Sequence, residues 1–555
     1  MSVRPGFKSA FAALAIAVTA TAAYLPAVRN GFAYDDVVVV QQDTRIHSLD
    51  HIGSIFAGGY WQSDDLALYR PMTTLSFAID WAIGNGSATW FHVSNLLLHV
   101  VVSILAFFLL ARLFARTPAF AGALVFALHP VHVEAVANIV GRAEILSAGF
   151  VLAAGLLWTS PRNGAFAEPR LAGAGGPRGP GRTLAIAGLF ALGLLSKESA
   201  VMLPAVLVLL DIGQGSVHPG RLRAWLRARA MPMLTLAVVL VCYFWLRAEA
   251  IGSVLPARVD PILEVAQTPL HRVFTALQAW PVWMRLLFFP DLLLADYGPR
   301  VLGPALWLTA EGVLGLVLMV AIVLGGVTAW RREQHLLSLG LLWFPVTILP
   351  VSNLIVPIGV LVAERTLYLP SFVIAMLIAG TASWIAAHRA AARPLATAAL
   401  AVVLLALGAR TFTRSPEWAS TDAIMLALVR DRPDAFRGRW HAARKARAAG
   451  QLRRAMAEYD TAIVLWPFRQ RLILEAIGFA AEQRHYARAF QLAQHAALQW
   501  PGDVDVQRQL AGSALDAGDL TVARRAIQAG LRLSPGDSLL RRMAAFADSA
   551  HGADR

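Results

Sequence analysis

Apolar and polar positions alternate in long blocks over the first 412 residues of the chain. Apolar blocks close to the ~20 residues that cross a bilayer as a helix recur throughout this part. About eleven membrane-spanning helices are therefore expected, near residues 9–29, 93–113, 118–138, 143–159, 183–196, 199–213, 231–250, 304–328, 336–350, 367–385 and 394–410. One more apolar stretch, 271–290, contains two prolines and is expected to lie at the membrane interface or to re-enter the membrane.

The C-terminal part follows a different period. Two sets of positions recur every 34 residues: Pro433, Pro467, Pro501 and Pro535, and Ala455, Ala489 and Ala523. This is the period of a tetratricopeptide (TPR) helix pair, in which small residues let two helices approach closely and a proline ends the second. We predict an all-α chain with a membrane domain over 1–412, a linker over 413–433, and a soluble TPR solenoid over 434–549. The solenoid would hold three repeats and a capping helix.

Composition supports the membrane interpretation. With 57% hydrophobic and 15% charged residues, the chain is too apolar for a soluble globular protein. The formal net charge of +14 would also fit a nucleic-acid-binding protein, but the basic residues cluster between apolar segments, as in membrane proteins. The positive-inside rule then places the N-terminus in the cytoplasm and the acid-rich loop at about 30–90 outside. An odd number of spans places the TPR domain outside as well.

Two features of the chain limit the alternatives further. The first apolar run follows basic residues and resembles a signal sequence, but with so many later spans we expect it to remain as an uncleaved anchor. Cys242 is the single cysteine, so no disulfide can form within the chain.

Asp35 and Asp36 are adjacent acids just beyond the first apolar segment. Neighbouring carboxylates repel each other, and partial burial adds a desolvation cost, so one pKa rises toward the range of a general base. The alternative is a solvated loop with two acids of no special role.

Further polar groups interrupt the apolar segments, where such residues are costly and mark functional sites. In the expected topology they all fall on the outer side. Cations there would suit a phosphate whose lipid tail lies in the bilayer, and a carboxylate opposite them would activate a hydroxyl. The candidates are Arg70, His92, His129, His132, Glu134, Arg142, Glu144, Lys197, Glu198, Glu364 and Arg365.

Several of these residues also fit purely structural roles. Glu364 and Arg365 fit an ion pair that pins a helix end. His129 and His132 fit core histidines that cap a helix, or, with Glu134, a metal site of weak spacing. Lys197 fits a lysine that reaches from an apolar helix toward the interface.

The motifs around these residues resemble one known family. They are Tyr34-Asp35-Asp36, Tyr69-Arg70-Pro71, His92 to His99, His129 to Val136, Gly141 to Glu144, Leu195 to Glu198, and Ala363 to Ser371. Together with the C-terminal repeats they are similar to the transmembrane and TPR-containing O-mannosyltransferases. The resemblance covers nearly the whole chain and implies the GT-C glycosyltransferase fold.

The resemblance also implies a reaction and roles. A sugar, mannose or another hexose, would pass with inversion from a polyprenyl-phosphate donor to a hydroxyl group. Asp35 would be the base and Asp36 would help to position the acceptor. Arg142, Lys197 and Arg365 would hold the donor phosphate, with Glu144, Glu198 and Glu364 fixing those cations. Arg70, His92, His129, His132 and Glu134 would support the site, and no metal or other cofactor is expected.

One departure from the family concerns the repeats. Relatives from animal cells carry longer arrays, whereas three repeats are expected here, and the high alanine and arginine content is typical of a bacterial chain. We therefore expect a bacterial inner-membrane protein whose repeats bind a protein or peptide segment. Protein hydroxyls are the favoured acceptor. A lipid or envelope-glycan acceptor, and a non-catalytic membrane scaffold that carries the repeats, remain the alternatives.

Overall fold

The computed structural model describes residues 5–61, 68–159, 179–217, 220, 222–254, 260–266 and 268–553. Within these residues the chain is helical and has no strand, which confirms the expected all-α class. Positions 62–67 of the expected outer loop lie outside the described residues. The chain divides into two compact units, Met1–Tyr297 with Pro304–Ile424, and Gly298–Gly303 with Met425–Arg555.

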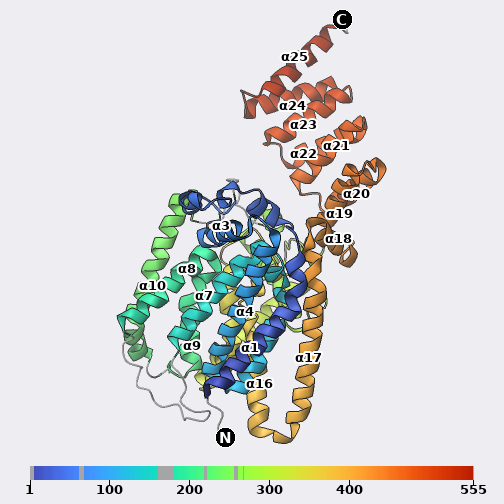
Figure 1. The fold of residues 1–555 in the computed structure, drawn as a ribbon. Helices are drawn as coiled ribbons and strands as arrows, with labels where there is room; N and C mark the ends of the chain where they lie inside the picture. The colour runs from blue at the N-terminus through green and yellow to red at the C-terminus, as the bar shows by residue number, and fades with distance from the viewer. Residues whose placement is uncertain are drawn as a thin grey trace. The chain divides into compact units, whose positions relative to one another are not determined.

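The first unit is built from long apolar helices that run side by side (Figure 1). Each of the eleven apolar segments expected to span the membrane overlaps one of them. Their bounds are α1 Pro5–Tyr24, α4 Ala88–Leu113, α5 Arg116–Leu128, α7 Arg142–Trp158, α8 Pro180–Ser196, α9 Leu203–Gly213, α10 Leu222–Ile251, α14 Ala310–Arg331, α15 His335–Ile348, α16 Phe372–His388 and α17 Arg393–Arg414.

Shorter elements connect the long ones. The stretch 271–290 forms two short helices in place of one long one. The short α-helices are α2 Ile52–Ala57, α3 Pro71–Gly84, α6 Val133–Val136, α11 Pro261–Val265, α12 Pro269–Leu277 and α13 Ala279–Phe288. The single turns are η1 Leu25–Arg29, η2 Val37–Gln41, η3 Thr44–Ile46, η4 Leu49–His51, η6 Pro130–His132, η7 Ile139–Gly141, η8 Glu198–Met202, η10 Leu349–Val351, η11 Glu364–Leu367, η12 Ala390–Ala392 and η13 Ser415–Ala419.

Six helices of the described residues are long and apolar enough to cross a membrane, or seven if a bent pair counts as one span. That pair is α5 with the segment Pro130–Val136, which η6 and α6 form, and its two parts meet at 47°. Three shorter apolar helices lie at Pro180–Ser196, His335–Val351 and Phe372–His388. The apolar helices indicate an integral membrane protein. The expected number of about eleven spans stays a prediction.

The first outer loop is folded around a hydrophobic core. Val39 and Val40, just after the acid pair, are buried with Phe77 of α3 and with Ile139 and Val140 of the η7 turn. This packing brings the loop that carries the acids against the start of α7. It is the contact on which the candidate site depends.

Gly141 lets the η7 turn fold tightly against α6. A Cβ atom at this position would lie within 2.6 Å of backbone atoms of Glu134 and Ala135. Side-chain atoms do not tolerate such distances from backbone, so only glycine fits here. The turn can therefore present Glu134 and Val140 close together.

The second unit contains helix pairs that repeat along the chain (Figure 1). The first helices of successive pairs begin 34 residues apart, and so do the second helices. Helix α18 Thr421–Asp431 begins in the first unit and ends in the second. The helices of the second unit that follow it are α19 Phe436–Ala448, α20 Leu452–Leu465, α21 Gln470–Glu482, α22 Tyr486–Gln499, α23 Val504–Asp516, α24 Leu520–Leu533 and α25 Ser538–Ala553. The expected linker, 413–433, holds the end of α17, η13 and α18. The assignment of these pairs as TPR repeats remains a prediction from their period.

Candidate functional site

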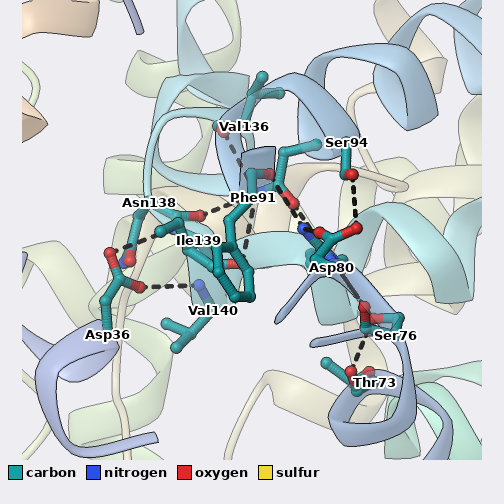
Figure 2. Close-up of polar contacts among 12 residues, drawn as sticks. Asp36, Thr73, Ser76, Asp80, Phe91, Ser94, Val136, Asn138, Ile139 and Val140 are labelled. Atoms are coloured by element: carbon teal, nitrogen blue, oxygen red, sulfur yellow. Dashed lines mark hydrogen bonds and ion pairs between the residues drawn. The ribbon is translucent and has the colours of Figure 1, made fainter. Parts of the chain in front are cut away.

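The two neighbouring acids have different surroundings. Asp36 is fully buried. Its Oδ1 accepts a hydrogen bond from the backbone N–H of Val140 at 2.9 Å, and its Oδ2 accepts from Ile139 at 3.3 Å (Figure 2) and from Ala33 at 3.2 Å. The Asp35 side chain keeps 24% of its surface exposed. Asp36 therefore ties the loop to the η7 turn, and Asp35 is the acid that a substrate can reach.

Burial raises the pKa of the Asp36 carboxyl to about 7, although its three N–H donors lower it. The donors fix both oxygens toward the protein. The structure thus gives Asp36 a holding role and leaves Asp35 as the partly exposed carboxylate of the pair.

Arg365 joins the acid pair to the α6 segment. Glu134 accepts from the Arg365 backbone N–H at 2.9 Å and from its Nη1 at 2.7 Å. Arg365 Nη2 lies 3.9 Å from Asp35 Oδ2. Although burial disfavours the charged form, Glu134 and Asp35 raise the pKa of Arg365 above its usual value. A fixed guanidinium therefore lies beside the accessible carboxylate.

Two more cations complete this charged cluster. Lys197 Nζ forms an ion pair with Glu144. Arg70 donates through Nε and Nη2 to Glu198 Oε2, at 3.0 and 2.9 Å. Lys197 also interacts electrostatically with Arg70 and Arg365, so the three cations share one neighbourhood.

Arg247 of α10 shares Glu198 with Arg70. Its Nη1 lies 3.4 Å from Glu198 Oε1. Burial alone would raise the pKa of Glu198, but Arg70 and Arg247 hold it at about 2. Glu198 is thus ionised, and two arginines surround one carboxylate.

Arg142 lies apart from the accessible cations, and the expectation that it holds the donor phosphate stays a prediction. Its side chain is 1% exposed and lies 2.5 Å from Asp80. It donates to Asn95 Oδ1 at 2.6 Å and to the carbonyl oxygens of Ser76 and Phe91, in the network around Asp80 that Figure 2 shows. A guanidinium with these partners is saturated, so we assign Arg142 to packing α7 against α3 and α4.

The acids that contact the cations come from other segments of the chain. Glu144 pairs with Lys197, Glu198 pairs with Arg70 and Arg247, and Arg365 pairs with Glu134. Side chains one or two positions apart point in different directions on a helical backbone. Each acid therefore meets a cation from another segment.

Glu364 also has its partners in another segment. Its Oε1 accepts from the Leu294 backbone N–H at 2.5 Å and from the Tyr297 hydroxyl at 2.8 Å. Burial raises its pKa to about 7, while nearby Arg414 lowers it. Glu364 thus anchors η11 to the 294–297 loop and does not fix the Arg365 guanidinium.

The histidines are buried and bonded within the core. His92 Nε2 lies 3.1 Å from the Gly31 carbonyl oxygen, and His129 Nε2 lies 3.0 Å from that of Leu287. His132 Nε2 lies 2.7 Å from Ser371 Oγ. These contacts fit the core-histidine alternative. Within the parts of the chain that the structure describes, no group of three or more His, Cys, Asp or Glu side chains could hold a metal ion.

Three residues with contacts at or beside the candidate site were not singled out from the sequence. They are Asp80, Arg247 and Tyr60, whose ring lies under the Arg70 guanidinium at 5.2 Å. Arg247 could have been found, because it is a charge at the end of an apolar run, where ionisable residues are costly. Asp80 carries the same signal, as the single charge in the apolar stretch 75–83, whereas Tyr60 carries none.

Several curated proteins are similar in sequence to this chain. No protein-family model matches the chain. The chain is 26% identical over 447 residues to the protein O-mannosyl-transferase TMTC3 of Mus musculus, covering 74% of this chain and 46% of the relative. It is 27% identical over 476 residues to TMTC4 of Homo sapiens, covering 77% and 62%. It is 31% identical over 304 residues to Tmtc2 of Drosophila melanogaster, covering 51% and 30%.

These matches confirm the resemblance that the motifs predicted. The chain spans about half the length of the first curated relatives that it matches, with 46%, 46% and 54% of them covered. Among solved structures, an archaeal oligosaccharyltransferase, AglB from Archaeoglobus fulgidus in complex with an inhibitory peptide and a dolichol-phosphate, aligns with a TM-score of 0.40 and 12% identity. That alignment covers 75% of this chain and 56% of the other.

Proposed function

We propose that this chain is a membrane glycosyltransferase that moves mannose or another hexose from a polyprenyl-phosphate donor to hydroxyl groups of proteins. The observation that carries the proposal is the accessible Asp35 carboxylate, 3.9 Å from an Arg365 guanidinium that Glu134 fixes. A base beside fixed cations suits transfer of a sugar from a phosphate. The curated relatives, which are named protein O-mannosyl-transferases, support the same chemistry.

In the proposed reaction, Asp35 takes the proton from the acceptor hydroxyl. The acceptor oxygen attacks the anomeric carbon, and the bond from that carbon to the phosphate oxygen breaks. The polyprenyl phosphate leaves with the bonding electrons, and the configuration at the anomeric carbon inverts. No metal or other cofactor enters these steps.

The cations of the cluster would bind the phosphate and stabilise its growing charge. We assign this role to Arg365, Lys197 and Arg70, whose side chains retain 24%, 8% and 15% exposure. Arg70 takes the place first expected for Arg142. Their acid partners hold each cation in place before the donor binds, and such preorganisation lowers the cost of reaching the transition state.

The proposal includes a location. The chain would lie in a bacterial inner membrane through about eleven spans, with the N-terminus in the cytoplasm and both the site and the TPR domain outside. The repeats would bind a protein or peptide segment, because stacked helix pairs form a concave surface.

Glycoproteomic mass spectrometry of envelope proteins tests the proposal, in source cells with and without this gene. We expect hexose-modified serine or threonine peptides that vanish on deletion and return with the wild type but not with Asp35→Asn. Unchanged glycopeptides with altered envelope lipids or glycans would instead identify a lipid or glycan acceptor. The protein would be a scaffold if Asp35→Asn fully restored the phenotype of the deletion strain and a variant without residues 434–549 did not.

A further inference from the structure

The loop that carries Asp35 is held by three separate parts of the fold. Asp36 ties it to the η7 turn, and His92 Nε2 contacts the Gly31 carbonyl oxygen at 3.1 Å. The third part is the segment 415–421, which follows α17 and belongs to the expected linker. The proposed reaction assigns no role to this third attachment.

Three hydrogen bonds make the third attachment. They run from Asn30 Nδ2 to the Ser415 carbonyl at 2.9 Å, from the Gly31 N–H to the Ala419 carbonyl at 2.9 Å, and from the Tyr34 N–H to Thr421 Oγ1 at 2.8 Å. The last of these is a side-chain contact to the residue immediately before Asp35. It is therefore the bond best placed to orient the Asp35 carboxylate.

The backbone at Tyr34 explains why such a bond is needed. Tyr34 has φ +53°, in the left-handed region that a bulky residue seldom adopts. A strained conformation persists only where the surroundings over-determine it, and such sites cluster where function requires a defined geometry. Thr421 supplies the acceptor that holds this conformation in place.

The Thr421 hydroxyl is not needed to start its own helix. Ser420 Oγ already accepts from the Ala423 N–H at 3.1 Å and so caps the first turn of α18. The contact of Thr421 with Tyr34 is therefore separable from helix capping by substitution. The two neighbouring hydroxyls have distinct partners.

We propose that Thr421 is a positioning residue for the reaction: its hydroxyl fixes the Tyr34 backbone and thereby the direction of the Asp35 carboxylate. This inference rests on the proposed function of Asp35 as the base. The segment 413–433 is then more than a connection between two domains, because its residues 415–421 complete the loop of the site.

Thr421→Val keeps the shape and removes the acceptor, and Thr421→Ser restores a hydroxyl. The matched control is Ser420→Ala, which removes the helix cap and leaves the Tyr34 contact. The full-length protein would be assayed with polyprenyl-phosphate mannose and with an acceptor peptide identified in the glycoproteomic comparison. Misplacing a reacting group by a fraction of an ångström lowers kcat and leaves ground-state binding intact.

We expect Thr421→Val to lower kcat roughly tenfold to a hundredfold, with an unchanged donor KM and a melting temperature lowered no further than in Ser420→Ala. Thr421→Ser should recover most of the rate, and Ser420→Ala should not reproduce the loss. Wild-type kcat in Thr421→Val beside an inactive Asp35→Asn would overturn the positioning role and leave the proposed function standing. Full activity of Asp35→Asn would overturn both. A kcat loss that Ser420→Ala matches would reduce Thr421 to a structural residue.

Discussion

Glu134 holds Arg365 by two hydrogen bonds, one from the backbone N–H and one from Nη1, at 2.9 and 2.7 Å. The two residues are 231 positions apart in the chain. The pair leaves Arg365 Nη2 facing Asp35 at 3.9 Å. A fork-shaped cation is needed to contact both acids, which makes the identity of residue 365 testable.

Arg365→Lys should raise the donor KM about tenfold, because an ammonium cannot reproduce the planar fork of a guanidinium. Steady-state rates at varied donor concentration measure the effect. The control is Arg285→Lys, in an exposed pair with Asp291 at 3.2 Å. Exposed pairs contribute little, so this variant should behave as the wild type. An unchanged KM in Arg365→Lys would remove Arg365 from donor binding.

Substitution by asparagine should have different effects at the two acids. Asp35→Asn should abolish transfer with an unchanged melting temperature, because its side chain is partly exposed and its charge is the base. Asp36→Asn should destabilise the protein by about 1–3 kcal/mol, because an amide NH2 group would face N–H donors of Ala33 and Ile139 or of Val140. Thermal unfolding in detergent with parallel activity assays distinguishes the two. Equal behaviour of both variants would contradict the division of roles.

Arg142→Leu should lower the melting temperature of the protein, because it leaves Asp80 buried without its counter-charge. Breaking a buried pair costs about 3–5 kcal/mol. Replacing both partners, in Arg142→Leu with Asp80→Leu, should recover part of the loss, because no lone charge is then buried. If Arg142→Leu had normal stability and a raised donor KM, Arg142 would instead be a residue that binds the donor phosphate.

Ionisation of Glu364 should lower the stability of the folded protein as the pH rises. Its pKa is raised from 4.5 to about 7 in the folded protein, so the folded state retains a proton that the unfolded chain releases. Raising the pH from about 4.5 to 7 should therefore lower the contribution of this group to the free energy of unfolding. Asp36, whose pKa is also raised to about 7, acts in the same range, so the measurement is the difference in melting temperature between the wild type and Glu364→Gln at each pH. Glu364→Gln cannot ionise, so this difference should change across the range, and a difference that stays constant would exclude a contribution from Glu364.

In the second unit, Glu475 joins three helices. It accepts from Arg444 of α19, from the Tyr459 hydroxyl of α20 at 2.6 Å, and from Trp440 Nε1 at 3.2 Å. Glu475→Ala should destabilise this unit by about 1–3 kcal/mol, because it leaves several donors without an acceptor. Glu482→Ala, which removes only a pair with Arg447, should cost under about 1 kcal/mol. Amide hydrogen exchange over 436–482 measures both. Equal protection in the two variants would contradict the joining role.

The sequence determined the helices of this protein. Apolar blocks of spanning length and the 34-residue recurrence of Pro433 to Pro535 both reflect local periodicity, which is a property of neighbouring residues. Costly charges such as Lys197 and Arg365 in apolar surroundings also marked the region of the site from sequence alone. These signals need no knowledge of distant contacts.

Only the tertiary structure decided what each charge contacts. It buried Asp36 under three N–H donors and left Asp35 accessible, although the two are neighbours in the sequence. It enclosed Arg142 with Asp80, and it gave Arg365 to Glu134 in place of the adjacent Glu364. The energy of a buried charge depends on partners from other segments and on exclusion of water, and neither is encoded in local spacing.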